Sequence, residues 1–343
     1  MDAGLRLGAA GTPEPALLVL ELDEAMDDAA LAYLAAAAES SVVPTIGVAR
    51  TPLGPRFADL GSALTATLIG QEAESAPWQA GVPDVEAALA MITATAAAAP
   101  RAAYTLAGLL RVTAAATVSE GLIAESLAYS MLLAGPEFGR WLAGYATKPL
   151  TQPAEPPVLL ERDGDALTIT LNRPERHNAF GRPVRDGLVE ACDLVAADPT
   201  ITRVLLAGNG ASFCSGGDLD EFGRNRDVPT AHLIRVDRSV AARLDRVRER
   251  VTVVLHGACI GAGIELASYA GRVIARPDAR IVLPELAMGL VPGAGGTVGI
   301  TRRIGRWRTA YLALTGRPLP LETALRWGLV DSVEEGRSDE LAG

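Results

Sequence analysis

The sequence predicts an α/β fold preceded by a mainly helical N-terminal region. From residue 158 onward, short β-branched runs alternate with segments of helical spacing, which is typical of repeated strand–helix units. Before residue 150, Ala- and Leu-rich segments with helical periodicity dominate. The chain has 343 residues and is about half apolar, so it can bury a large core in one or two domains.

Residues 1–80 are expected to form a βαβ-like extension of unknown role. The apolar runs 16–22 and 44–49 read as strands, and the Ala/Leu-rich segment 27–39 between them reads as a helix.

Residues 81–150 are expected to be helical. Asp84 is a suitable N-cap for a helix over 85–98, and Pro100 marks a break before further helical segments. A Pro-rich stretch from Pro149 to Pro157 then reads as a linker. Its composition separates the helices from a third region, residues 151–343, which we expect to be the core that carries the chemistry.

The third region contains the strand and helix signals of the α/β fold. The predicted helix covers 182–196 and is amphipathic. The predicted strands cover 166–171, 204–207, 251–255, 272–275 and 281–283.

Charge and cysteine content exclude several classes of protein. The net charge of −10 argues against a general nucleic-acid binder and against a polybasic membrane anchor. Cys192, Cys214 and Cys259 fit neither a disulfide framework nor a zinc site, so we expect a reduced, cytoplasmic environment and no metal. The N-terminus lacks a charged start followed by an apolar run, so no signal peptide is predicted.

Two glycine-rich segments follow predicted strands. In Ser212–Asp218, two glycines after a serine allow a sharp turn and leave a backbone amide free to contact a ligand. In His256–Ala267, a strand leads through a glycine-rich turn into a helix, whose first amides favour a developing negative charge. The spacing does not fit the GxGxxG fingerprint of dinucleotide-binding proteins.

Two further features follow these glycine-rich segments in the sequence. Glu285 directly follows an apolar strand and Pro284, an unusual place for a charge that only meets solvent. The stretch Pro292–Thr297 is another glycine-rich turn that opens a helix and is expected to shape a pocket beside Glu285. The three histidines have no zinc-motif spacing and no GxSxG surrounds Ser215, which disfavours a Ser-His-Asp triad.

The order of these segments resembles the crotonase family, also called the enoyl-CoA hydratase/isomerase family. The twenty-residue step from Glu265 to Glu285, the segment 172–179 and the segment 316–331 resemble motifs of that family. The resemblance covers about residues 158–335 and implies a ββα superhelix core.

The resemblance also implies roles for individual residues. The amides of Ser215 and Ala262 would form an oxyanion hole for a thioester oxygen, and Glu265 and Glu285 would be the two acid–base carboxylates. No cofactor is implied beyond the coenzyme A of the substrate. Asp218 is otherwise a turn residue, and Arg173 and Arg176 are equally well explained as surface charges. The implied substrate-binding residues are Gly216, Gly217, Asp218, Gly261, Gly293, Gly295, Arg173 and Arg176.

Hydration of a 2-enoyl-CoA to a 3-hydroxyacyl-CoA is the expected activity. The alternatives are another reaction of the same family (isomerisation, hydrolysis, decarboxylation or cofactor-free dioxygenation) and a non-catalytic partner subunit. The expected partner is the acyl-CoA substrate, and the expected assembly is a homotrimer or homohexamer.

Residues 84–148 resemble the helical tail that follows the core in most crotonases. This suggests a circular permutation in which the tail precedes the core and packs on it near the acyl pocket. The alternative interpretation is that residues 1–150 are a decayed crotonase copy or an unrelated helical domain.

Overall fold

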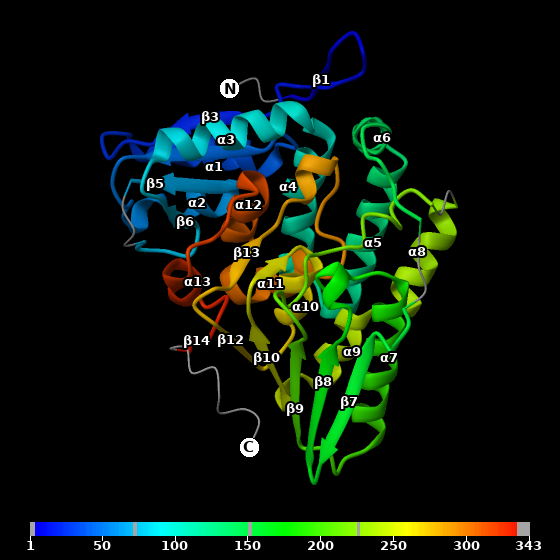
Figure 1. Cartoon of the computed structure of the whole chain (residues 1–343). Coiled ribbons are helices and arrows are strands. Elements are labelled where there is room, and N and C mark those ends of the chain that lie inside the picture. Colours follow the sequence, from blue (N-terminus) through cyan, green and yellow to red (C-terminus); the bar gives the residue numbers. More distant parts are fainter. Residues whose placement is uncertain (1–3, 71–73, 150–152, 225–226, 335–343) are drawn as a thin grey trace.

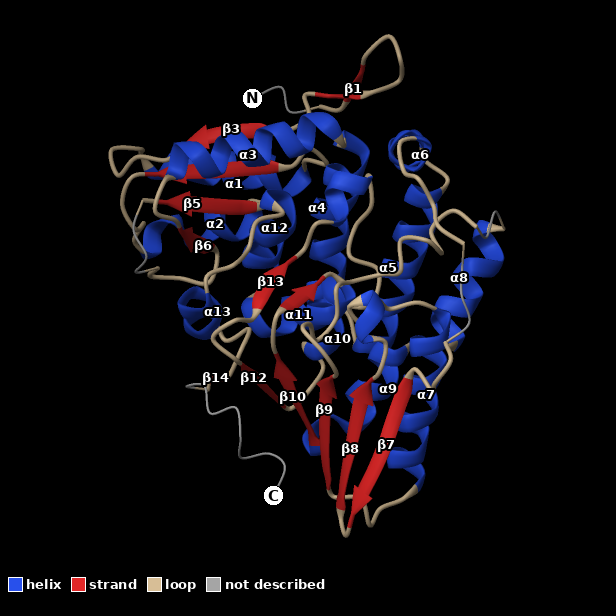
Figure 2. Ribbon diagram, in the orientation of Figure 1, coloured by secondary structure: helices blue, strands red, loops and turns tan. Residues whose placement is uncertain are grey.

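The computed structural model describes residues 4–70, 74–149, 153–224 and 227–334. The expected α/β architecture with a helical N-terminal region is confirmed (Figures 1 and 2). A six-stranded sheet lies at one end of the molecule and a four-stranded sheet at the other, with helices between them.

The six-stranded sheet forms the base of the second half of the chain. All neighbouring strands are parallel except the antiparallel pair at one edge, β7 and β8. Val253, in the central strand Val251–Leu255, pairs with Leu206 on one side and Val273 on the other. The strand order is β14 (Ser332–Val333), β12 (Arg272–Ala275), β10 (Val251–Leu255), β9 (Arg203–Gly208), β8 (Ala166–Leu171) and β7 (Val158–Asp163).

A separate two-stranded sheet positions the site. Strand β11 (Ala258–Ile260) pairs in parallel with β13 (Arg280–Val282), with Cys259 opposite Ile281. Helix α10 (Ala262–Ala267) follows β11, and the 3₁₀ turn η4 (Glu285–Met288) follows β13. Because parallel strands end at the same edge, α10 and η4 begin side by side.

Helices cover this second half of the chain. The predicted helix over 182–196 is present as α7 (Arg182–Ala197). The other helices are α8 (Val228–Asp237), α9 (Val240–Val247), α11 (Gly296–Ile304), α12 (Arg306–Thr315) and α13 (Leu321–Trp327), with 3₁₀ turns η2 (Pro174–Arg176) and η3 (Arg248–Arg250).

The first 80 residues contain the predicted strand–helix–strand unit as β3 (Leu18–Glu21), α1 (Asp28–Ser40) and β4 (Thr45–Ala49). Two further parallel strands extend the sheet, in the order β3-β4-β5-β6. Elements that the sequence did not predict are β1 (Arg6–Leu7), β2 (Pro13–Glu14), η1 (Pro55–Phe57), α2 (Ala58–Ala63), β5 (Ala66–Ile69) and β6 (Gln79–Gly81).

Four helices follow: α3 (Val85–Ala98), α4 (Pro100–Ala115), α5 (Val118–Leu133) and α6 (Pro136–Ala143). Asp84 caps α3 as predicted, since its carboxylate accepts a hydrogen bond from Ala87 N at 2.9 Å. Pro100 and Pro136 each begin a helix, where the missing N–H costs nothing.

These helices pack on the second half of the chain. Helices α4 and α5 contact α11, and α3 contacts α12. Thr113 Oγ1 on α4 donates to the Thr297 carbonyl at 2.8 Å, and Leu106, Leu110 and Phe138 lie in one continuous core with residues of the six-stranded sheet. Residues 150–152 of the expected linker fall outside the described part of the chain.

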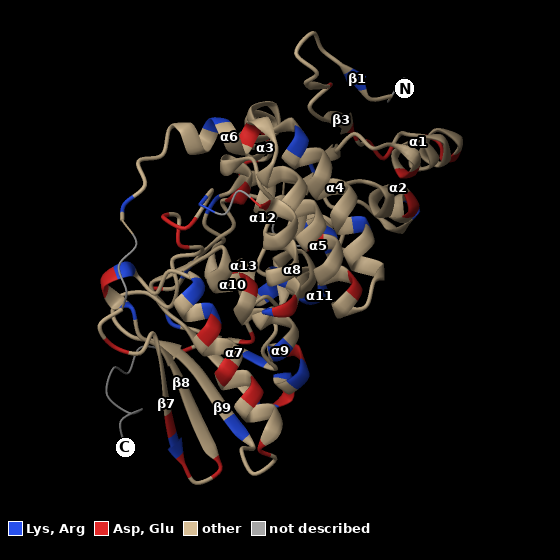
Figure 3. Ribbon diagram, turned by 90° about the vertical axis from the view of Figure 1, so that its right-hand side faces the viewer, with Lys and Arg blue, Asp and Glu red and all other residues tan. Residues whose placement is uncertain are grey.

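Helices α7 and α9 carry charged residues of both signs, whereas α4 and α12 carry few charges (Figure 3). Within the described ranges, none of the helices combines the length and the apolar character needed to span a membrane.

Candidate active site

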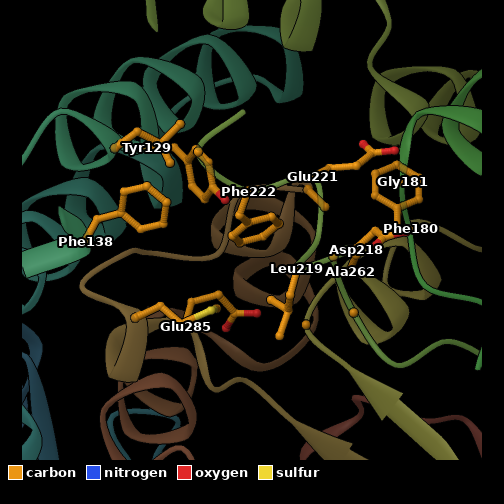
Figure 4. A pocket seen from close by; sticks show the side chains of 18 of the residues that line it. Tyr129, Phe138, Phe180, Gly181, Asp218, Leu219, Glu221, Phe222, Ala262 and Glu285 are labelled. Carbon is orange, nitrogen blue, oxygen red and sulfur yellow. The ribbon is translucent and has the colours of Figure 1, made fainter. Parts of the chain in front are cut away.

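A cavity of about 1140 Å³ opens where β11 and β13 end (Figure 4). Its lining comes from both halves of the chain: the segment 215–224, the starts of α10 and η4, and helices α5, α6 and α8. Glu265 and Glu285 both line it, so the structure brings together the two carboxylates that the sequence singled out.

Glu265 lies in the first turn of α10 and is only 2% exposed. Its Oε2 accepts hydrogen bonds from Ala294 N at 2.8 Å and Gly296 N at 2.9 Å. Burial raises the pKa of Glu265 to about 7, even though these backbone donors favour the ionised form. The side chain is therefore fixed in direction and titrates near neutrality.

Glu285 begins η4 and is 7% exposed. Its Oε2 is buried and has no hydrogen-bond partner among the described residues. Burial, and then the charge of Glu265, raise the pKa of Glu285 well above its ordinary value. A carboxyl that stays protonated and has an unengaged oxygen can exchange a proton with a bound molecule.

The structure corrects one of the two expected oxyanion donors. The Ser215 N–H already donates to the His177 carbonyl at 3.0 Å, so it is not free for a ligand. The N–H of Gly217 forms no hydrogen bond with another described residue, and Gly217 lines the cavity. The physical reason is strand alternation: Phe180 bridges to this segment through Gly216 O and Asp218 N, which leaves the intervening amide on the other side.

Ala262, the second expected donor, is the first residue of α10 and also lines the cavity. Its N–H has no acceptor among the described residues, as expected for the first turn of a helix. Gly217 and Ala262 therefore offer two unengaged amides beside the two carboxylates.

Three expected substrate-binding residues form an ion cluster instead. Asp218 is 2% exposed and pairs with Arg176 at 2.7 Å and with Arg173 at 3.6 Å. Arg176 also contacts Asp220 at 2.6 Å. Neither arginine lines the cavity, and Arg173 is buried. Asp218 reaches the cavity wall, but its carboxylate is engaged, so the cluster holds the 215–224 segment in place.

Of the expected glycines, Gly216, Gly217, Gly261 and Gly293 line the cavity, and Gly295 does not. Gly295 lies two residues beyond Gly293, and its N–H donates to Glu125 Oε1 at 2.7 Å.

An aromatic wall is the main feature that the local sequence motifs did not signal. Tyr129 from α5, Phe138 from α6 and Phe222 lie together at the cavity (Figure 4). Trp141 from α6 also lines the cavity, and its ring stacks on that of Phe138 with the centroids 5.7 Å apart. Only the resemblance of these helices to a crotonase tail placed them near an acyl pocket.

A second missed residue is Glu125 on α5, a buried carboxylate behind the turn that holds Glu265. Its signal in the sequence was weak, because an isolated glutamate in a helix is ordinarily exposed. Within the described part of the chain, His, Cys, Asp and Glu side chains form no cluster of three or more suited to a metal ion.

The enoyl-CoA hydratase/isomerase family model matches residues 161–338, just over half of the chain. The chain is 36% identical to a 1,2-epoxyphenylacetyl-CoA isomerase of Escherichia coli, over 50% of this chain and 68% of that protein. It is 32% identical to a 2,3-dehydroadipyl-CoA hydratase of Escherichia coli, over 51% of this chain and 68% of that protein. Among solved structures, Pseudomonas aeruginosa AtuE superimposes with a TM-score of 0.50 at 31% identity, over 54% of this chain and 72% of that one.

Fold, site and matches together define an enzyme with a crotonase core. The chain belongs to the enoyl-CoA hydratase/isomerase family, as the resemblance indicated.

Proposed function

We propose that this enzyme hydrates a 2-enoyl-CoA thioester to the 3-hydroxyacyl-CoA. The observation that carries the proposal is the pair of buried carboxylates, Glu265 and Glu285, in one cavity with the unengaged amides of Gly217 and Ala262. Water addition needs these two kinds of group: donors for a developing oxyanion, and a base and an acid for the two protons that move.

In the proposed reaction, the thioester oxygen accepts hydrogen bonds from Gly217 N and Ala262 N. Glu265, whose ionised form is favoured by hydrogen bonds from Ala294 N and Gly296 N, takes a proton from water as the water oxygen bonds to C3. Glu285, whose pKa is raised by burial and by the charge of Glu265, delivers a proton to C2. One water is consumed, the C2–C3 double bond becomes a single bond, and proton exchange with solvent restores both carboxyls.

The acyl group would lie against the aromatic wall of Tyr129, Phe138, Trp141 and Phe222. Burial of an acyl chain there contributes about 25 cal/mol per Å² of apolar surface removed from water. The reaction requires no cofactor beyond the coenzyme A of the substrate. Support for an acyl-CoA substrate comes from the relatives, two of which are named as CoA-thioester enzymes.

The test is hydration of crotonyl-CoA and longer 2-enoyl-CoAs by the purified protein, with Glu265→Gln and Glu285→Gln alongside. Each substitution should lower kcat by about 10³-fold or more with an unchanged circular-dichroism spectrum. Wild-type turnover in either variant would contradict the acid–base assignment.

Double-bond isomerisation is the second candidate, favoured by the unpartnered Oε2 of Glu285. Moving a proton between two carbons needs only one carboxyl, so an isomerase would depend on Glu285 and tolerate Glu265→Gln. Assaying both variants with a 3-enoyl-CoA separates the two reactions.

A homotrimer or homohexamer remains our proposal for the assembly, and it rests on the family resemblance. Sedimentation velocity at micromolar concentration should give a trimer or a hexamer, and a monomer there would contradict it.

A further inference from the structure

Four consecutive backbone amides alternate between two buried carboxylates. Ala294 N and Gly296 N donate to Glu265 Oε2 at 2.8 and 2.9 Å. Gly295 N donates to Glu125 Oε1 at 2.7 Å, and Thr297 N to Glu125 Oε2 at 2.9 Å. Thr297 Oγ1 adds a contact to Glu125 Oε2 at 2.6 Å. The turn is therefore held from two opposite sides.

The carbonyls of the same turn are also engaged. Tyr269 Oη donates to Gly295 O at 2.8 Å, and Thr113 Oγ1 donates to Thr297 O at 2.8 Å. Glu125 is 2% exposed and lies on α5, far in sequence from the rest of the site. Burying a carboxylate costs free energy unless hydrogen bonds compensate for its lost hydration. The hydrogen bonds that Glu125 accepts from the described residues all come from the turn that holds Glu265.

We propose that Glu125 is a positioning residue for Glu265: it fixes the 294–297 turn, whose amides hold the Glu265 carboxylate. The inference rests on the proposed function, in which Glu265 is the base. It adds that a residue of the N-terminal helices controls that base.

Glu125 acts on Glu265 through the turn and not through its charge. The titratable and charged groups that face Glu125 are Glu265 on α10, Glu285 on η4, Tyr269 after α10, and Arg235 on α8. On its own helix it faces Tyr129. Burial and the charge of Glu265 raise the pKa of Glu125 to about 8. Because the pKa of Glu125 lies above the value of about 7 for Glu265, Glu125 is still protonated when Glu265 ionises and carries no charge that opposes that step.

A purely structural role makes a different prediction. If Glu125 only ties α5 to the core, loss of its contacts should lower stability, and the titration of Glu265 should not move. Thr297→Val is the matched control, because it removes only the hydroxyl contact to Glu125 and leaves both amide contacts. Glu125→Gln keeps the size of the side chain but turns an NH₂ group toward the N–H of Gly295 or Thr297, so that one amide contact is lost.

The experiment follows the Glu265 carboxyl by ¹³C NMR in full-length protein labelled at glutamate Cδ, with the signal assigned by its loss in Glu265→Gln. We expect Glu125→Gln to raise the Glu265 titration midpoint by about half a pH unit or more, because it displaces the Ala294 and Gly296 amides that favour the ionised form. Thr297→Val should leave the midpoint within about 0.3 unit. The acid limb of kcat/KM for crotonyl-CoA hydration should shift in parallel. An unmoved midpoint in folded Glu125→Gln would overturn the positioning role.

Glu125→Asp keeps the carboxyl group but withdraws it by one methylene. It should raise the midpoint in the same direction and lower kcat by about tenfold or more, because the turn is no longer held. It also serves if Glu125→Gln does not fold, and a wild-type kcat in Glu125→Asp would refute the positioning role. The NMR measurement needs no turnover: a raised midpoint in a protein that does not hydrate crotonyl-CoA would retain the positioning role and reject the proposed function.

Discussion

The carboxylate of Glu285 occupies the space that a side chain at Gly261 would need. A Cβ placed on Gly261 would lie 2.4 Å from Glu285 Oε1, well inside van der Waals contact. Gly261 also has a φ of +49°, in the left-handed region that favours glycine. The strand–turn–helix segment and the second carboxylate are therefore fitted to each other, although they are 24 positions apart in the chain.

Gly261→Ala should therefore displace Glu285 as well as strain the turn. We expect kcat/KM for 2-enoyl-CoA hydration to fall by about 10²-fold or more, because small misplacements of catalytic groups are costly. Gly108→Ala on α4 is the control: no atom lies within 4 Å of its Cβ position, and alanine favours a helix. Equal losses in the two variants would show that the Gly261–Glu285 fit is irrelevant to catalysis.

Ala262→Pro tests the oxyanion donor at the start of α10. Proline is tolerated at the first position of a helix, so the change removes chiefly one N–H. We expect kcat to drop by about 10²–10³-fold, the usual cost of losing one such donor. Ala262→Gly keeps the N–H and should stay within about threefold of wild type. A fully active Ala262→Pro enzyme would rule out this donor.

Stability should fall as pH rises, because the buried carboxyls bind protons more tightly in the folded state. Their folded pKa values lie above the ordinary value of 4.5, so the native state holds extra protons from about pH 4.5 upward. That contribution is complete below pH 4.5 and is lost as pH rises through the folded pKa values, about 7 for Glu265 and well above 4.5 for Glu285.

Denaturant unfolding between pH 5 and pH 9 measures this effect. Glu285→Gln should flatten the pH dependence and be more stable than wild type at pH 9, by roughly 1 kcal/mol or more, since one pKa unit corresponds to about 1.4 kcal/mol. Parallel stability curves for the two proteins would mean that folding does not raise the pKa of Glu285.

The N-terminal helices should remain bound to the core when the connector is cut. Helices α3, α4 and α5 contact α11 and α12 of the region that the family model matches, which supports the proposal that 84–148 acts as a crotonase tail. With a protease site placed in the Pro149–Pro157 connector, the cleaved halves should co-elute and stay active. Deleting residues 1–157 should abolish soluble activity, because the core would expose apolar surface.

Two soluble fragments that separate on a sizing column, with full activity in the second, would show an independent N-terminal module. The permutation proposal would then fail.

Much of the fold could be read from local sequence patterns. The strand at 251–255 and the helix at 85–98 were predicted with correct ends, since alternation, caps and prolines are local signals. The strands β5 and β6 were missed because they are short. Strand β5 has four residues in an Ala-rich stretch, and β6 has three residues in a polar one.

The site was predicted where motifs are contiguous and missed where it depends on folding. Glu265, Glu285 and Ala262 were singled out from short motifs, and all three line the cavity. The choice of Ser215 over Gly217 was wrong because only the pairing with His177 and Phe180 shows which amide is free. Glu125 reaches the site from 140 positions away in sequence, and no local pattern signals such a contact.

The fate of the water oxygen tests hydration by Glu265 and Glu285 most directly. Crotonyl-CoA is incubated with the enzyme in H₂¹⁸O, and the acyl-CoA product is analysed by mass spectrometry, with the Glu265→Gln/Glu285→Gln double variant as the control. We expect 3-hydroxybutyryl-CoA carrying one ¹⁸O at C3 from the wild-type enzyme and none from the double variant. Unlabelled, unreacted crotonyl-CoA with wild-type enzyme, or equal labelling by the double variant, would contradict hydration by these two glutamates.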